Sequence, residues 1–453
     1  MSLRWSGFQR KSSLTDHGPV ALRQAALDIL EHGIRAADPY PRILSLVARD
    51  GRWLQVGKLL YDLSEWNRIF VVGAGKATQA VAGALEEVLT EHLTSGIVTL
   101  KRGESHHLER IRIIEASHPV PDQDSLEGAK EIARVVQQAG RRDLVFVAIT
   151  GGSSALISWP IGDITLKDKQ AITLLLLGCG ASIREINDIR KHISRIKGGR
   201  LGQMIFPAEL INLTVSDVIG DPLDYITDPT VPDTSTYEDA WRTMDKFGLW
   251  EKAPASIRCY LQRGAEIETP KTYNQRYHSF IAVESDAACQ GSAQRCRELG
   301  FETRILTTSM EGESCKAAAA FVREAIAIAR SSPTGKRYAF LASGETTVTL
   351  GEVFGEGGRN QEFALSAAFQ IAGSQDVVVA SLATDGTDGP TDCCGGLIDG
   401  ETIERARARR GIDPAEGLCL HSAKPVLAAA GDLLISGPTG TNVNDVALLL
   451  IET

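Results

Sequence analysis

This sequence of 453 residues has no long hydrophobic run. Its longest apolar stretch, around residues 171–177, is far shorter than the roughly 20 residues that a membrane-spanning helix needs. The first residues also lack the apolar core of a signal peptide. We therefore expect a cytoplasmic protein that has no membrane partner.

Positive charge is scarce, and so are paired cysteines. The chain has 48 Lys and Arg against 57 Asp and Glu, a net charge of −9, which argues against a nucleic-acid partner but leaves room for a local basic pocket. Its eight cysteines are too sparse for a disulfide scaffold, and they form no CxxC pair that would suggest a zinc site.

Glycine, in contrast, is abundant, with 43 residues, and many glycines follow short apolar runs. Runs of this kind at residues 68–72, 143–149 and 210–215 alternate with helical patterns such as residues 77–89. This alternation indicates a parallel sheet with helices on both faces. The first 65 residues are expected to be helical, with a clear helical period over residues 21–34.

A second α/β rhythm follows an irregular stretch at residues 241–273. Its expected strands are residues 279–283, 303–306, 337–341 and 377–382, and its expected helices are residues 286–299 and 313–329. The sequence therefore predicts two α/β domains in series, residues 1–260 and 261–453. Both sheets are expected to be mostly parallel, the first domain Rossmann-like, with an interdomain cleft as the ligand site.

The loop after the first apolar run, GAGKA at 73–77, opens a helix. Gly73 and Gly75 let the backbone approach an oxyanion, and Lys76 adds a positive charge. The dinucleotide fingerprint GxGxxG fails at its third glycine, where Thr78 stands, and the Walker A pattern fails as well. The hypothesis is an anion or nucleotide loop of another type, and the alternative is a plain tight turn.

A second loop, TGGSS at 150–154, follows another apolar run and offers hydroxyls and backbone amides to a phosphate. It does not match the GxSxG pattern of a serine nucleophile. It is similar to SGETT at 343–347, either by chance or because both loops bind anions. The residues that these two loops put forward are Gly151, Gly152, Ser153, Ser154, Gly344, Glu345 and Thr346.

Basic residues cluster at 187–200 inside this acidic chain, and they are either a solvated helix or a binding surface. The cluster consists of Arg190, Lys191, Arg195, Lys197 and Arg200, and His192 among them could be a packed or a surface histidine.

Carboxylates also follow strands, where they can hold Mg²⁺ or accept a proton. Asp217 is the favoured candidate in the first half, with Asp221 and Asp224 beyond it, whereas Asp228-Pro229 is typical of a turn. Asp385 lies in a loop whose spacing does not fit an EF-hand. Arg359, after two glycines and before a helix, is placed to bind a carboxylate or a phosphate.

Taken together, these segments resemble the class II glycerate kinases, the glycerate 2-kinase family with a MOFRL-type C-terminal domain. The blocks that carry the resemblance lie in order along nearly the whole chain: GAGKA at 73–77, HPVPD at 118–122, TGGSSAL at 150–156, KGGRL at 197–201, SDVIGDP at 216–222, SGETTVT at 343–349, GGRNQE at 357–362, TDGTDGPTD at 384–392 and GPTGTNVND at 437–445.

The resemblance implies transfer of the γ-phosphoryl group of ATP to the 2-hydroxyl of D-glycerate, with Mg²⁺. Lys76 would contact the phosphoryl oxygens, and Arg359 the glycerate carboxylate or the transferred group. Asp217 and Asp385 would hold the metal and accept the proton, with no firm division between them. Further polar contacts are expected from Lys191, Asn360, Glu362, Asn442 and Asp445.

Two other functions compete with the kinase. A hydroxypyruvate reductase would use NAD(P)H, although the broken GxGxxG argues against it. A non-catalytic sensor of sugar acids or phosphate would bind without turnover. The acidic residues in the anion-type loops argue against a pure sensor, since a site for an anion alone would avoid them. A homo-oligomer is compatible with all three functions.

Overall fold

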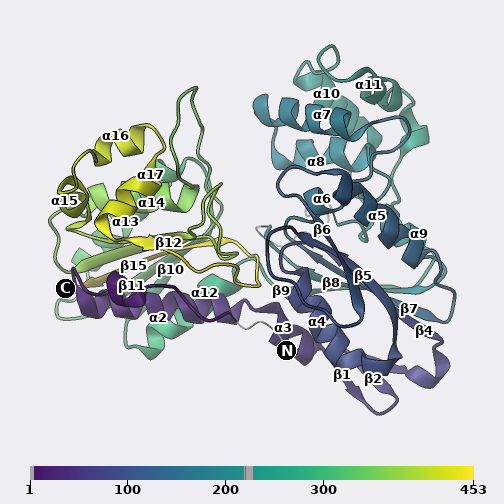
Figure 1. The fold of residues 1–453 in the computed structure, drawn as a ribbon, viewed down its shortest axis with the longest axis horizontal. Coiled ribbons are helices and arrows are strands. Elements are labelled where there is room, and N and C mark those ends of the chain that lie inside the picture. Colours follow the sequence, from purple (N-terminus) through teal and green to yellow (C-terminus); the bar gives the residue numbers. More distant parts are fainter. Residues whose placement is uncertain (1–4, 219, 221–227) are drawn as a thin grey trace. The chain divides into compact units, whose positions relative to one another are not determined.

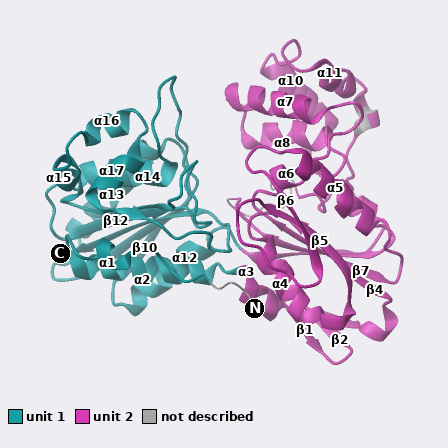
Figure 2. Cartoon of the chain, viewed as in Figure 1, with its two compact units in different colours: residues 1, 3–38, 284–453 teal, residues 2, 39–283 magenta. Residues whose placement is uncertain are grey.

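The computed structural model describes residues 5–218, 220 and 228–453, which form two compact units (Figure 2). Unit 1 combines residues 5–38 with Glu284–Thr453, and unit 2 is the continuous segment Pro39–Val283. This division differs from the expected boundary at residue 260 in two ways. The N-terminal helices belong to the unit of the C-terminal half, and the strand expected at 279–283 belongs to unit 2. No helix in the described part of the chain is long and apolar enough to cross a membrane.

Unit 2 is built on a six-stranded parallel sheet in the order β6-β5-β4-β7-β8-β9 (Figure 1). Its elements are α3 (Pro39–Leu46), β1 (Val47–Asp50), β2 (Trp53–Val56), β3 (Leu59–Asp62), β4 (Arg68–Ala74), α4 (Thr78–Leu89), β5 (Leu93–Lys101), β6 (Ile111–Ala116), α5 (Gln123–Val136), β7 (Asp143–Thr150), α6 (Ser153–Leu156), α7 (Leu166–Gly178), α8 (Ile183–His192), α9 (Arg200–Ile205), β8 (Glu209–Val215), α10 (Tyr237–Lys246), α11 (Ala255–Leu261) and β9 (Tyr277–Val283), with short 3-10 turns at Leu63–Glu65, Thr90–His92 and Gly264–Ile267.

The buried apolar strands of this sheet confirm the predicted α/β architecture. Every residue of β7 and β8 is buried, as expected for strands covered on both faces. Helices α5 and α9 pack on one face in a cluster that includes Phe70, Val72, Val145 and Val147. Helix α4 begins one residue after the predicted start and packs with α3.

The expectation of helices throughout the first 65 residues is wrong for residues 47–62, which form the antiparallel sheet β1-β2-β3. Each pair of strands is joined by a two-residue turn that contains a glycine with positive φ, Gly51 in the first and Gly57 in the second. Such turns match the twist of a hairpin, and they are the local signal that the helical interpretation overlooked.

Four helices of unit 2, α7, α8, α10 and α11, form a layer of their own beyond the carboxyl ends of β4 and β7 (Figure 1). They share a separate apolar cluster that includes Ile172, Ile189, Met244 and Ile257. The polar loops at the end of the sheet therefore lie next to a second set of side chains, which this helical layer supplies.

Unit 1 has a six-stranded sheet in the order β10-β11-β15-β12-β13-β14. Its elements are α1 (Lys11–Leu14), α2 (Val20–Ala36), α12 (Ala287–Glu298), β10 (Glu302–Met310), α13 (Ser314–Arg330), β11 (Arg337–Gly344), α14 (Arg359–Gln370), β12 (Val377–Leu382), β13 (Gly395–Asp399), α15 (Thr402–Arg407), α16 (Pro414–Cys419), α17 (Ala423–Ala430), β14 (Leu433–Leu434) and β15 (Asp445–Glu452).

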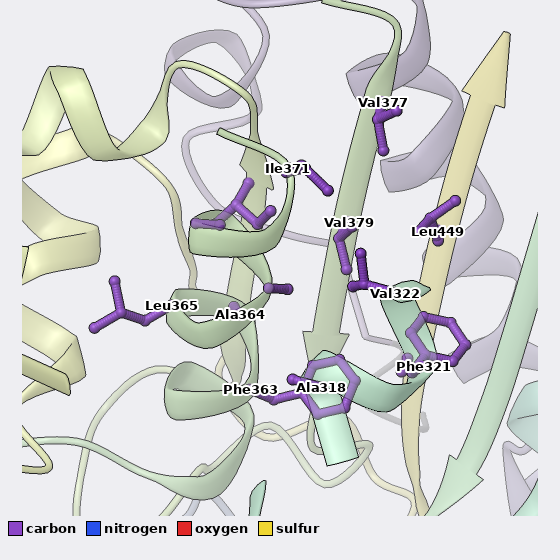
Figure 3. Packing of buried hydrophobic residues seen from close by; sticks show 14 of the residues in the cluster. Ala318, Phe321, Val322, Phe363, Ala364, Leu365, Ile371, Val377, Val379 and Leu449 are labelled. Carbon is purple, nitrogen blue, oxygen red and sulfur yellow. The ribbon is translucent and has the colours of Figure 1, made fainter. Parts of the chain in front are cut away.

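In unit 1 the expectation of a mostly parallel sheet does not hold, because β10–β11 is the parallel pair and the other four pairings are antiparallel. No helix lies between β12 and β13, so the chain returns in the opposite direction. The core lies between this sheet and α13, α14 and α17, where Phe321 and Phe363 pack with ring centroids 5.9 Å apart (Figure 3).

Candidate active site

The first two predicted anion loops lie at the point where the sheet of unit 2 changes direction. From the central pair β4 and β7, the strand order runs outward to β5 and β6 on one side and to β8 and β9 on the other. In open α/β sheets, ligands bind beyond the carboxyl ends of such a central pair. The loop after β4 carries Lys76, and the loop after β7 carries Gly151 to Ser154. The fold thus places both loops at its expected binding position.

Gly75 allows these two loops to touch. Its φ is +140°, and a Cβ there would lie 2.0 Å from Thr150 Oγ1. The Lys76 backbone N–H donates to the Gly151 carbonyl at 2.9 Å, and the Ala77 N–H donates to Thr150 Oγ1 at 3.1 Å. The backbone amides of the GAGKA loop are therefore used to join the loops.

Lys76 lies beside Gly152, at the beginning of α6. A Cβ on Gly152 would be 3.2 Å from Lys76 Cγ and 3.3 Å from His118 Cδ2, so a side chain there would crowd both residues. Gly152 has a φ of +87°, and the Ser153 side chain is buried beside it. The structure thus places Lys76, Gly152 and His118 together, and His118 is a residue whose proximity the sequence analysis did not predict.

The second loop has a charge of its own, which the sequence analysis missed. Lys197 Nζ donates to Ser154 Oγ at 2.9 Å, and Lys197 is only 1% exposed. The motif KGGRL gave no indication of this contact, because Lys197 and Ser154 are distant in the sequence and meet only in the fold.

The basic cluster at 187–200 is not a solvated helix. Lys191 and His192 are both buried, and Lys191 Nζ pairs with the buried carboxylate of Asp233 at 2.9 Å. His192 is a packed histidine, with Nδ1 2.7 Å from the Asp188 carbonyl and Nε2 3.1 Å from Glu268. Burial raises the pKa of Asp233, but Lys191 and neighbouring hydroxyls outweigh burial and lower it overall. The Asp233 contact thus fixes the position of the Lys191 ammonium.

The acidic residues after β8 have different surroundings. Asp217 is half-buried directly beyond the strand, whereas Asp221 and Asp224 lie outside the described residues. Asp228 is buried and accepts hydrogen bonds from Asn212 Nδ2 at 2.9 Å and from the Thr230 backbone N–H at 2.7 Å. Asp228 therefore stabilises the local turn, in agreement with the turn interpretation.

In unit 1, Arg359 begins α14 and is held by two carboxylates. Its Nε and Nη2 donate to Asp445 at 2.5 and 2.9 Å, and Nη2 also donates to Glu345 at 3.0 Å. Burial lowers the pKa of Arg359, but these carboxylates, Asp445 foremost, outweigh it and raise the pKa above the ordinary value. Among the described contacts, Nη1 has no partner, so its two N–H groups can still donate to a ligand.

The N-terminus of α14 is occupied by an internal carboxylate. Asp388 accepts from the backbone N–H groups of Asn360 and Gln361 at 3.1 and 2.9 Å, and burial raises its pKa to about 6. The Asn360 side chain is also used internally, because it donates to Asp388 and its Oδ1 accepts from Ser381. Neither this helix terminus nor the Asn360 side chain is open to a ligand in this arrangement.

Two polar loops of unit 1 carry oxygen donors that fit a magnesium ion. The loop containing Asp385 joins the one containing Asn442 through Thr439 Oγ1, which donates to the Thr384 carbonyl at 2.6 Å. Asp385 is half-buried, and the side-chain oxygen and nitrogen of buried Asn444 have no hydrogen-bond partner. Carboxylate and amide oxygens are the ligands that Mg²⁺ prefers. Asp385 belongs to unit 1, whereas Asp217 belongs to unit 2.

The loop after β11 differs from its counterpart after β7. At Gly344, where φ is +146°, a Cβ would lie 2.2 Å from the Met310 carbonyl, and no helix begins within the following ten residues. Thr346 is buried, while Glu345 points to Arg359. The sequence similarity of the two loops therefore does not extend to a shared strand-loop-helix geometry.

A compact group of possible metal ligands occurs elsewhere in unit 1, at His17, Asp399 and Asp432. The two carboxylates are already paired with Arg23 and Arg405, at distances of 2.6 to 3.0 Å. Arginine charges thus occupy the position that a cation would need, and the group stabilises the fold.

Two family models match the chain in order. One, described as "Domain of unknown function (DUF4147)", matches residues 25–262, and the other, the MOFRL family, matches residues 338–445. The chain is 39% identical to Glycerate 2-kinase of Pyrococcus horikoshii, over 95% of this chain and 98% of that protein. It is 37% identical to D-glycerate 2-kinase of Thermotoga maritima, over 96% and 99%.

The fold also agrees with solved structures over nearly its full length. The crystal structure of glycerate kinase from Thermotoga maritima is similar with a TM-score of 0.79 and 35% identity, covering 96% of this chain and all of that one. A Pyrococcus horikoshii crystal structure gives a TM-score of 0.75 and 38% identity. With both family models in order and relatives aligned from end to end, the chain belongs to the class II glycerate kinase family, with its DUF4147 and MOFRL segments.

Proposed function

We propose that this protein transfers the γ-phosphoryl group of ATP to the 2-hydroxyl of D-glycerate and forms 2-phosphoglycerate. The observation that carries the proposal is the contact between Lys76 and the Gly151–Ser154 loop at the centre of the parallel sheet. Curated relatives with 37% and 39% identity are named for this reaction, and they align over nearly the whole chain.

Phosphoryl transfer needs cations to hold the phosphates and a fixed direction of attack. In this proposal Lys76 binds oxygens of the transferred group, because its stem lies beside Gly152 in the loop that follows β7. Ser153 and Ser154 would position the phosphates beside it. The Arg359 guanidinium, oriented by Asp445, would give its Nη1 to the carboxylate of the acceptor or to the phosphoryl group.

Mg²⁺ would neutralise charge on the phosphates when bound. The residues we propose for holding it are Asp385, Asn442 and Asn444, whose loops join through Thr384 and Thr439. Asp217 remains the proposed acceptor of the hydroxyl proton in unit 2, since it is half-buried and directly follows β8. This division of roles assigns one carboxylate to each task.

The test is ADP release with ATP, Mg²⁺ and D-glycerate, followed by phosphorus NMR of the product. We expect a 2-phosphoglycerate signal, and we expect Lys76→Met to lower kcat by roughly 100- to 1,000-fold, the usual loss for a preorganised group that stabilises transition-state charge. Lys58→Met is the matched control, because Lys58 is exposed in the turn between β2 and β3. A 3-phosphoglycerate product would contradict the proposed position of transfer.

The same purified protein can be assayed for the alternative activity, reduction of hydroxypyruvate. Thr78, at the position of the third fingerprint glycine, is fully buried, and its Oγ1 lies 3.2 Å from Thr150 Oγ1. We therefore expect no oxidation of NADH or NADPH at 340 nm with hydroxypyruvate. Oxidation, or thermal stabilisation by glycerate without turnover, would favour the reductase or the sensor over the kinase.

A further inference from the structure

Three basic side chains of unit 2 have no acidic partner among the described residues: two are buried lysines, and the third is a half-buried arginine that donates to Asn187 Oδ1 at 3.5 Å. Lys169 lies on α7, Arg190 on α8 and Lys197 on the turn after α8. Lys169 and Lys197 are 2% and 1% exposed, and Nε of Arg190 is buried with no hydrogen-bond partner. None of the three forms an ion pair with any residue that the structure describes. We call these residues the buried cation cluster.

The two lysines of the cluster use few of their hydrogen bonds. Lys169 Nζ donates to Ser158 Oγ at 2.8 Å, and Lys197 Nζ donates to Ser154 Oγ at 2.9 Å. An ammonium group has three N–H donors, so each lysine retains donors without an acceptor among the described residues. Both known acceptors are neutral serine hydroxyls on one short segment that follows β7.

Burial and repulsion between neighbouring positive charges both lower the pKa values of the two lysines in the cluster. Burial, together with the nearby charge of Arg190, lowers the pKa of Lys169 to about 7. Burial also lowers the pKa of Lys197, and Lys169 and Arg190 both contribute to the shift. The negative charge of Asp228 raises the pKa of Lys197, but the Asp228 oxygens already accept hydrogen bonds from Asn212 and Thr230.

Helix α8, which carries Arg190, also contains a buried lysine that has an acidic partner. Lys191 is 2% exposed, one position after Arg190, and its ammonium bonds to the carboxylate of Asp233. A buried charge without such a partner is costly, and it typically persists where a ligand of opposite charge completes the site. The contrast between Lys191 and the cluster thus indicates an incoming anion.

The cluster adjoins the candidate active site. Ser154 is partly exposed and belongs to the loop after β7, in which Gly152 lies against Lys76. Lys197 is therefore separated from that loop by a single hydroxyl group. An anion held there would lie beside the group that Lys76 contacts.

We propose that Lys169, Arg190 and Lys197, with Ser158, form the subsite that binds the carboxylate of the hydroxy-acid substrate. The inference rests on the proposed function and extends it, because it names the residues that select an acid over a neutral alcohol. Two of the reaction's anionic groups need separate cations, the phosphoryl group and the carboxylate. In this proposal Lys76 serves the first, and the recessed cluster serves the second.

Lys197→Met is the principal test, with the full chain in every measurement. We expect the KM for D-glycerate, and its Kd by calorimetry, to rise roughly 10- to 100-fold, the loss typical of a hydrogen bond to a charged group. The Kd for ATP should change by less than about two-fold, because ATP makes no contact with the cluster in this proposal. The preference for D-glycerate over glycerol, a neutral acceptor, should fall by the same factor.

Stability separates this role from a structural one. Lys197→Met removes an unpaired buried charge, so we expect the unfolding temperature to stay equal or rise. Lys169→Met is the second variant and should show the same pattern. Lys167→Met, an exposed lysine on the same helix, is the matched control and should leave every constant unchanged.

Other outcomes would overturn the inference. An unfolding temperature that falls together with both affinities would mean that the cluster is structural. A loss confined to ATP would assign the cluster to the nucleotide phosphates, and unchanged glycerate binding would remove it from the site. If the wild-type chain binds D-glycerate through Lys197 but does not phosphorylate it, the proposed function fails while the inference stands.

Discussion

Individual charged residues in this protein differ in whether the fold pairs them. Arg23 is completely buried and bonds to two carboxylates, and Lys191 is matched by Asp233. Lys169 and Lys197 have serine hydroxyls instead. The distinction matters for function, because paired charges stabilise the fold and unpaired ones can respond to a ligand.

The pH dependence of substrate binding follows from Lys169. Burial and the nearby charge of Arg190 lower the pKa of this lysine to about 7. At pH 8.5, before the substrate binds, its side chain is therefore mostly the neutral amine. A bound carboxylate favours the charged form and raises the pKa, so binding takes up a proton there. We expect D-glycerate affinity to be highest below pH 7 and to fall as pH rises toward 9.

Calorimetry in two buffers of different ionisation enthalpy measures this proton uptake. It should be larger at pH 8.5 than at pH 6, and at pH 8.5 it should be smaller in Lys169→Met than in wild type, because only Lys197 then remains to take up a proton. The groups that face Lys169 are Arg190, which stays charged over this pH range, Lys197, whose pKa is also lowered, and the neutral Ser158 hydroxyl. Equal uptake in Lys169→Met and wild type would contradict this assignment.

At this scale the sequence revealed local relations and missed distant ones. Lys76 could be found because its glycines and its helix are neighbours in the chain. Lys197 meets Ser154 only through the fold. One signal was available for Lys169, since it shares a helical face with buried Ile172 and Leu176 at intervals of three and four residues. That spacing predicts a buried lysine.

At the level of elements, the loops after β4 and β7 depend on the missing side chain of Gly75. Gly75→Ala would place a Cβ 2.0 Å from Thr150 Oγ1 and 2.6 Å from the Thr150 carbonyl. We expect it to cost about 2–5 kcal/mol of unfolding free energy, from left-handed strain plus overpacking, and to lower kcat because Lys76 moves.

Gly103→Ala is the control for that experiment, because Gly103 also has a positive φ, +89°, but no atom lies within 4 Å of its Cβ position. It should show the strain alone, about 1–2 kcal/mol, with kcat unchanged. Urea unfolding and initial rates give both quantities. Equal losses in the two variants would mean that the contact between the loops has no effect of its own.

The bounds of elements with a strong hydrophobic pattern could be predicted from the sequence, but the neighbour with which a strand pairs could not. Strand β12 has the bounds expected from its apolar run, and α4 starts one residue late. The strand after residue 277 was found but assigned to the wrong sheet, because sequence spacing does not tell which neighbour a strand pairs with. This strand, β9, follows α10 and α11 in the chain and pairs in parallel with β8.

For the whole molecule, the least predictable feature is the path of the N-terminal segment. Helix α2 packs against α12, so residues 5–38 complete a unit whose other residues begin at Glu284. Sequence order suggested the opposite assignment, because neighbouring segments usually pack together. Residues from opposite ends of the chain contact one another in this unit.

Arg23 provides the test of that long-range connection. Its guanidinium lies 2.6 Å from Asp399 and 2.7 Å from Asp432, and all three side chains are fully buried. Arg23→Met leaves both carboxylates with Arg405 as their remaining arginine, so we expect a loss of about 3–5 kcal/mol in unfolding free energy. Exposed Arg35→Met, which breaks a 3.4 Å pair with Glu31, should cost less than about 1 kcal/mol. Proteolysis during urea unfolding should cleave unit 1 first in Arg23→Met, since the network belongs to that unit; earlier cleavage in unit 2 would mean that the N-terminal segment stabilises the chain elsewhere.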